Sequence, residues 1–205
     1  MANFTPQEQL MLELINRARM NPAGEAARYG IALNEGLPSN PISTAPKEVL
    51  AGNDRLGLSA DKHSDWMITN DTFSHSERSG SPHFFGEDPF LRMDNALYVG
   101  AFAEGENIAL VYSTAALNTT QAMLDMERNL FMDTNPPYPG RGHRLNILDA
   151  NYNEVGIGQF TGTWTTGGKN YYGSTVTQMS VQRLMLAKFF EAPSPTGSVR
   201  PSRGR

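Results

Sequence analysis

The residues of this chain that could carry chemistry are four histidines and a few carboxylates in unusual places. His75 closes a short aromatic-led segment just beyond a predicted helix, and His143 sits in the glycine-rich segment 140–144. We expect these glycines to let the backbone approach another element closely. Glu106 enters an apolar, strand-like segment. Two imidazoles and two carboxylates suffice for a divalent ion such as zinc, because carboxylates can hold its water or orient the rings.

Glu127 is the second candidate carboxylate. Counted by fours, Met123, Glu127 and Phe131 share one stripe of a predicted helix. Burying a carboxylate alone costs several kcal/mol, so an inward Glu127 must be paired, hydrogen-bonded or coordinated. The alternative is an outward Glu127 that pairs with Arg128 or Arg141. If Glu127 is not part of the site, the first replacements are acids on or just beyond the same helix: Asp125 and Asp133. Spacing alone does not bring the four groups together.

The other two histidines have simpler interpretations. His63 lies on the apolar side of its predicted helix, beside Trp66 and Met67, which favours a core histidine with one hydrogen-bond partner. His83, between Ser81-Pro82 and Phe84-Phe85, is expected to lie on the surface or to pack a loop.

Composition limits the class of protein. A chain of 205 residues with 39% hydrophobic residues supports one domain with a core. A formal charge of −4 argues against nucleic acid as a partner. Cysteine is absent, which excludes disulfides, thiolate catalysis and cysteine-based zinc sites. No apolar run approaches the roughly 20 residues that span a bilayer, so we expect no transmembrane segment.

The pattern of apolar residues, caps and breakers predicts helices alternating with a few strands. A capping box from Thr5 to Glu8 opens a first helix that Asn21-Pro22 ends, and a short helix follows over 22–28. Further predicted elements are an irregular segment 34–57, a helix 59–71 capped by Ser59, a loop with a short helix over 73–95, a strand 102–111, a helix 114–132, and strands 155–160 and 171–181. This order suggests a layered α/β/α arrangement.

Five motifs in order give the chain a family resemblance. They are His63-Ser64-Asp65-Trp66-Met67, Phe73-Ser74-His75, Gly105-Glu106-Asn107-Ile108-Ala109, Gly142-His143-Arg144-Leu145-Asn146-Ile147-Leu148 and Glu154-Val155-Gly156-Ile157-Gly158. The set covers about residues 5–181 and resembles the bacterial branch of the CAP superfamily, which includes cysteine-rich secretory, antigen 5 and pathogenesis-related-1 proteins.

The resemblance implies a three-layer α-β-α sandwich with a small, mostly antiparallel central sheet and a large open cleft. We expect this domain to cover residues 1–188. From Ala192 on, Pro, Ser, Gly and Arg dominate, so residues 189–205 are expected to form a disordered tail. The cleft tetrad of the family corresponds to His75, Glu106, Glu127 and His143, with His75 and His143 as ligands of a divalent metal, expected to be zinc. Ser74, next to His75, and Asn107, next to Glu106, are expected to support the residues of the tetrad. The Glu127 helix lacks the tryptophan usual in the family.

Three functions follow from the resemblance. The first is a binding module whose cleft holds a divalent metal and a small-molecule or lipid ligand. The second is a metal-assisted hydrolase with Glu106 or Glu127 as general base. The third is a passive interaction module of a larger secreted protein. Nothing in the sequence resembles an oxyanion hole or a placed nucleophile, so hydrolysis ranks below binding.

The N-terminus, Met1 to Pro6, lacks the basic-then-apolar layout of a signal peptide. Similar domains precede calcium-binding repeats and a C-terminal export signal in large bacterial proteins. We therefore expect an extracellular protein exported without an N-terminal signal peptide. The sequence does not indicate the oligomeric state.

Overall fold

The computed structural model describes residues 2–133 and 141–183. The predicted domain boundary at residue 188 and the predicted tail 189–205 lie outside this part of the chain. The elements, in order, are α1 (Pro6–Met20), α2 (Pro22–Arg28), β1 (Ala51–Gly52), α3 (Asp54–Thr69), α4 (Pro89–Asn95), β2 (Ala101–Ser113), α5 (Thr119–Met132), α6 (Gly142–Ile147), β3 (Glu154–Thr166) and β4 (Lys169–Arg183). None of the described helices is long and apolar enough to cross a membrane.

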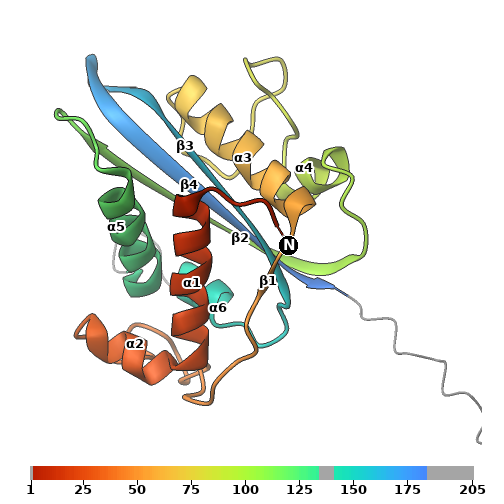
Figure 1. Ribbon diagram of the computed structural model, residues 1–205, viewed down its shortest axis with the longest axis vertical. Coiled ribbons are helices and arrows are strands. Elements are labelled where there is room, and N and C mark those ends of the chain that lie inside the picture. The colour runs from red at the N-terminus through yellow and green to blue at the C-terminus, as the bar shows by residue number, and fades with distance from the viewer. Residues whose placement is uncertain (1, 134–140, 184–205) are drawn as a thin grey trace, which may run out of the picture.

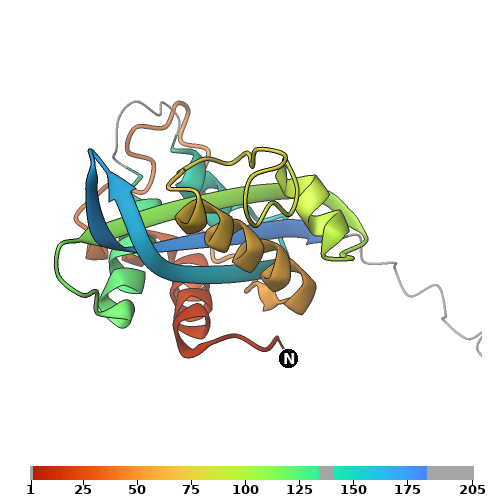
Figure 2. The ribbon, with the colours of Figure 1, turned by 90° about the horizontal axis from the view of Figure 1, so that it is seen from above.

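The strands form one sheet in the order β1-β3-β4-β2. β1 pairs parallel with β3, whereas β3 with β4 and β4 with β2 pair antiparallel. In Figure 1 α3 and α4 lie on one side of this sheet, and α1, α2, α5 and α6 lie on the other. The predicted three-layer α-β-α sandwich with a mostly antiparallel sheet is therefore confirmed. In Figure 2 β2 (green) runs along one outer side of the sheet, as the strand order requires.

Alternation along β3 explains how the two helical layers sit on the sheet. Val155 and Ile157 are fully buried in the core shared with α1, α5 and α6. Successive side chains of a strand point to opposite faces, so Gly156 and Gly158 face α3. A Cβ atom on Gly158 would lie 2.0 Å from the backbone nitrogen of Asp61, so α3 rests directly on the backbone of β3.

Helix boundaries follow their caps. The capping box at Thr5 and Glu8 is present, as predicted. The predicted start of α3 at Ser59 is wrong, because Asn53 already caps the backbone N–H groups of Arg55 and Leu56, and α3 begins at Asp54. The sequence also places the start of α5 too early, since Asn118 is its N-cap. The short helix α6 was not predicted, because it has only six residues and no side-chain N-cap.

Candidate functional site

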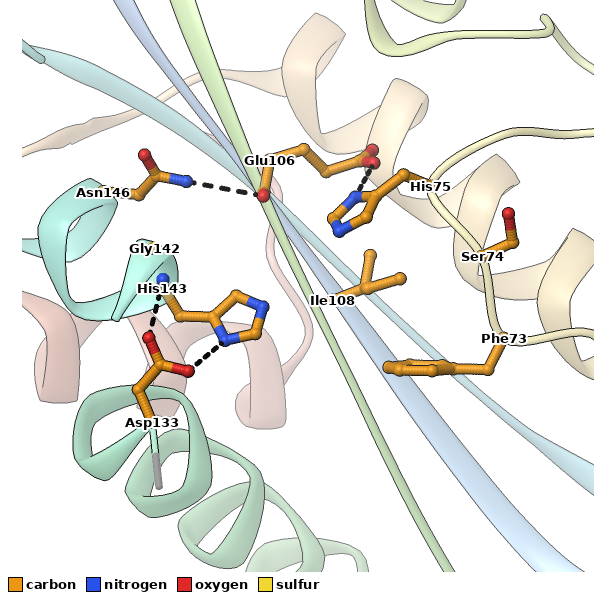
Figure 3. A pocket seen from close by; sticks show the side chains of 9 residues that line it. All are labelled: Phe73, Ser74, His75, Glu106, Ile108, Asp133, Gly142, His143 and Asn146. Carbon is orange, nitrogen blue, oxygen red and sulfur yellow. Dashed lines mark hydrogen bonds and ion pairs between the residues drawn. The ribbon is translucent and has the colours of Figure 1, made fainter. Parts of the chain in front are cut away.

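A pocket of about 290 Å³ opens between the helical layers at the edge of β2. It is lined by Phe73, Ser74, His75, Glu106, Ile108, Asp133, Gly142, His143 and Asn146. In Figure 3 β2 passes between the two histidines, with Phe73 and His75 on one side and His143 and Asn146 on the other. The residues therefore come from both layers of the sandwich and meet across one strand.

His75 is oriented by a buried carboxylate. Its Nδ1 atom lies 2.8 Å from Oε1 of Glu106, whose side chain is 3% exposed, while the imidazole is 52% exposed. Burial alone would raise the pKa of Glu106, but the hydrogen bond from His75 and nearby positive charge outweigh burial and hold the pKa below its ordinary value. Glu106 is thus an anion that accepts the Nδ1–H of His75. The other ring nitrogen, Nε2, faces the pocket.

A fully buried arginine holds this carboxylate in place. Arg92, on α4, pairs with the second oxygen of Glu106 and donates to the carbonyl oxygens of His75 and Gly86, each at 3.2 Å. It also lies 3.8 Å from Glu77. Because Arg92 binds both Glu106 and the backbone of His75, it fixes the carboxylate and the imidazole relative to each other.

Behind Arg92, Glu77 ties the loop before α4 to α3. One oxygen of Glu77 accepts the backbone N–H groups of Phe85 and Gly86 at 2.7 and 3.2 Å. The other lies 2.9 Å from Nδ1 of His63, which is completely buried. The interpretation of His63 as a core histidine with one partner is therefore confirmed.

His143 has a carboxylate of its own. Its Nδ1 atom lies 2.9 Å from one oxygen of Asp133, and its backbone N–H donates to the other oxygen at 3.0 Å. Burial would raise the pKa of Asp133, but the hydrogen bonds and charge of His143, with the backbone N–H of Arg144, outweigh burial and lower the pKa. Figure 3 shows the His143 ring turned toward the space that His75 also faces.

Two neighbours of His143 fix the position of α6. Arg144 is fully buried and donates to the carbonyl oxygens of Phe131 and Met132 at the end of α5, and to that of Leu33 at 3.0 Å. Carbonyls at a helix end lack partners within the helix, so a buried guanidinium is well suited to satisfy them. Asn146 donates to Oδ1 of Asn107 on β2 at 2.9 Å. α6 is therefore held to both α5 and the sheet.

The structure brings three residues of the predicted tetrad together and leaves the fourth elsewhere. His75, Glu106 and His143 line the pocket, but Glu127 does not. Glu127 is fully buried, as one interpretation required, yet it accepts a hydrogen bond from the hydroxyl of Tyr29 instead of approaching a histidine. Burial raises the pKa of Glu127 to about 7, although the Tyr29 hydrogen bond opposes this shift. Asp133, named from the sequence only as a replacement, occupies the position expected of Glu127.

The other residues named from the sequence agree with the structure only in part. Asn107 donates to the carbonyl oxygen of His143 at 3.3 Å, so it supports His143 and not its sequence neighbour Glu106. Ser74 lines the pocket but hydrogen-bonds the backbone of Ser76, within its own turn. His83 is exposed and pairs with Asp65 at 2.8 Å. The expected close approach is wrong at Gly142, because a Cβ there would meet nothing within 4 Å, and Gly140 lies outside the described residues.

Sequence reasoning missed Arg92 and Asn146 as members of the site. Arg92 stands in an ordinary short helix behind a capping aspartate, and nothing in that segment signals a buried guanidinium. Asn146 could have been found, because it lies three positions after His143 and so on the same face of a helix.

Comparison with known families identifies the family of this chain. The sequence matches the profile of the CAP family, described as the cysteine-rich secretory protein family, over residues 12–176. This chain belongs to the CAP family. It does so without the cysteines of the family's description, since it contains none. The chain matches no curated protein sequence at a significant level.

Two solved structures are similar to this chain. The chain is similar to Na-ASP-1, with a TM-score of 0.50 and 12% identity over 86% of this chain and 39% of that chain. It is also similar to an extracellular SCP-domain protein from Bacillus anthracis, with a TM-score of 0.47 and 21% identity over 89% of this chain and 45% of that chain. The chain therefore spans less than half the length of either protein.

Proposed function

We propose that the pocket of this CAP domain binds a divalent metal ion, zinc or one of similar preference, through the Nε2 atoms of His75 and His143. The observation that carries the proposal is the pairing of each Nδ1 atom with its own carboxylate, Glu106 or Asp133. Metal-binding histidines almost always donate their other ring N–H to a carboxylate, a carbonyl or water, which fixes the tautomer and raises ligand basicity.

The donor set fits an open site. Within residues 2–133 and 141–183, no group of three or more His, Asp or Glu side chains is arranged to hold a metal. Two imidazoles are one protein ligand fewer than the three of catalytic zinc sites, and the remaining coordination positions would go to water or to a small ligand. A pocket of about 290 Å³ has room for such a ligand beside the ion.

Binding ranks ahead of metal-assisted hydrolysis. Hydrolysis needs a carboxylate free to act as general base with a pKa near the working pH. Glu106 and Asp133, the acids that line the pocket, each accept a hydrogen bond from a histidine, and the pKa of each is held below its ordinary value. Both are therefore better suited to orient an imidazole than to take a proton from water.

Zinc titration followed by calorimetry and by the thermal midpoint tests the proposal. Zinc should stabilise the folded protein by mass action, by about 2.7 kcal/mol at a hundredfold excess over Kd. His75→Ala and His143→Ala should each lose this response, whereas the control His83→Ala, on the exposed loop, should keep it. Equal responses in all four proteins would contradict the site, and no response in the wild type would favour a passive interaction module.

We further propose that the protein acts outside the cell, on the support of the secretory description of its family. Immunodetection in the culture medium of the source cells, beside a cytosolic marker, tests this. Retention of the protein with the marker would contradict it.

A further inference from the structure

We propose that an extended peptide segment of a partner protein binds along the free edge of β2 as an added strand. β2 is an outer strand of the sheet, and it is 13 residues long, whereas the other outer strand, β1, has two residues. Edge strands offer a row of unpaired N–H and C=O groups, which is the template used in recognition by strand addition.

The contacts of Asn146 identify which groups of β2 face outward. Its side-chain amide reaches the carbonyl oxygen of Glu106 at 3.5 Å, from the side opposite β4. The register of β2 with β4 is regular from Ala103 to Ser113, and backbone groups alternate between the two edges of a strand. The N–H and C=O groups of Ile108 and Leu110 therefore also face outward. In the part of the chain that the structure describes, no hydrogen bond reaches these groups.

This edge is the floor of a groove. The pocket between the histidines continues into a second cavity of about 270 Å³, with Phe73, Ile108, Asp133 and His143 lining both. The second cavity adds Ala109, Leu110, Asn129 and Leu130. In the second cavity Phe73 therefore forms one wall, and Asn129 and Leu130 of α5 form the other. Figure 3 shows Phe73 and His143 on opposite sides of β2 in the first cavity.

Apart from Asn146 of α6, which covers the carbonyl oxygen of Glu106, this stretch of β2 carries few of the devices that normally block a strand edge. Ile108 is only 4% exposed, so a bound peptide must displace the side chains that cover it. Natural edges are protected by lysine, proline, bulges or an overlying element. From Glu106 to Leu110 the strand has no lysine or proline, and its one irregularity lies outside this stretch, between Ala101 and Ala103. The buried Glu106 is neutralised by Arg92 rather than presented to the edge.

These features specify the occupant. Because Asn146 reaches the carbonyl oxygen of Glu106, the outward groups left to a peptide in the groove are those of Ile108 and Leu110. A peptide of about five residues, which extends about 17 Å, spans this stretch with one residue to spare at each end. Its alternate side chains would face Phe73 on one wall and Leu130 on the other, which favours apolar or β-branched residues. The proposal does not depend on metal binding, because the backbone groups that it uses are present in the metal-free protein.

Three synthetic peptides with identical side chains test the proposal: acetyl-Thr-Val-Thr-Val-Thr-amide, a form N-methylated on both valines, and a form N-methylated on all five residues. Strand addition uses only one edge of the peptide, so the first two should bind and the third should not. In metal-free protein, binding should shift the amide NMR signals of Ile108 and Leu110 and slow their hydrogen exchange. The inward amides of Asn107 and Ala109 should change much less.

A proline variant supplies the matched test on the protein. Leu110→Pro removes an outward N–H without removing a bond to β4, and edge strands tolerate such a proline. It should weaken binding by at least about threefold, as the loss of one hydrogen bond requires. Leu110→Pro should also bind more weakly than Leu110→Ala, which loses the same cavity-lining side chain but keeps the N–H. Tyr112→Pro, on the same edge beyond the groove, should bind within about twofold of the wild type.

Equal binding of the fully methylated peptide would overturn the proposal, because apolar side chains alone would then explain binding. Protection of the Ile108 and Leu110 amides in the free protein would also overturn it. Such protection would mean that the chain itself covers the edge, or, if it grows with protein concentration, that a second copy does.

Discussion

Asp133 holds His143 at two points, with one carboxylate oxygen 2.9 Å from Nδ1 and the other 3.0 Å from the backbone N–H. Asp133 ends α5 in a left-handed conformation, with φ 49°. Aspartate and asparagine adopt this conformation more readily than most residues. The same residue therefore ends a helix and orients a candidate metal ligand, and this double role cannot be recognised by counting along the helix stripe.

Asp133→Asn should weaken zinc binding by roughly 10- to 100-fold, because it keeps the shape and the left-handed backbone but removes the charge behind His143. Glu127→Gln is the matched control, since Glu127 lies outside the pocket, and its zinc affinity should equal that of the wild type. Calorimetric titration of both variants measures this. A loss of affinity in Glu127→Gln alone would return Glu127 to the site.

Glu127 should make the stability of the fold depend on pH. Its pKa is about 7 in the folded protein, against 4.5 for an ordinary glutamate. The folded chain therefore holds this proton more tightly than the unfolded chain, so stability is retained below about pH 4.5 and is lost as the pH rises to about 7.

Glu127→Gln removes this loss, because glutamine has no charge to bury and can still accept the Tyr29 hydrogen bond. The variant should match the wild type at pH 5 within about 1 kcal/mol and exceed it at pH 8 by on the order of 3 kcal/mol. Urea unfolding at both pH values measures the difference. A variant less stable than the wild type at pH 8 would show that the ionised carboxylate is favourable where it lies.

Gly158→Ala should destabilise the protein by about 3 kcal/mol or more, because the new methyl group would overlap the backbone of Asp61 in α3. This backbone cannot move aside unless the whole helix moves. Gly142→Ala, where nothing lies within 4 Å, should change stability by less than about 0.5 kcal/mol. Thermal unfolding of the pair checks this. Equal midpoints would mean that α3 does not rest on β3 as closely as described.

Arg92→Leu should lower the free energy of unfolding by roughly 3 to 5 kcal/mol, because it leaves the carboxylates of Glu77 and Glu106 buried without their counter-charge. Arg78→Leu, on the exposed loop of the same layer, should change it by less than about 0.5 kcal/mol. Urea unfolding at pH 7 compares the two. Similar stabilities would indicate that His63 and water compensate the acids without Arg92.

The sequence predicts the elements well where local chemistry decides them. The capping box at Thr5 and the short helix Pro22–Arg28 are confirmed, since caps and prolines act over a few residues. The site is only partly predictable. Helix periodicity correctly placed Glu127 on a buried face, but one face of a helix can meet the core at several depths. Which acid reaches His143 depends on how α6 docks on α5 through Arg144, a contact between segments that sequence spacing does not reveal.

The two histidines of the pocket are anchored to different helical layers, here called slabs, on opposite sides of the sheet. His75 is anchored, through Glu106 and Arg92, to the slab of α3 and α4, whereas His143 is anchored, through Asp133 and Arg144, to that of α5 and α6. An ion shared by both imidazoles would therefore act as a cross-link between the slabs, and its affinity would report their spacing. Core substitutions that change the thickness of the sandwich, far from either imidazole, should therefore lower the affinity for the ion although neither histidine is altered.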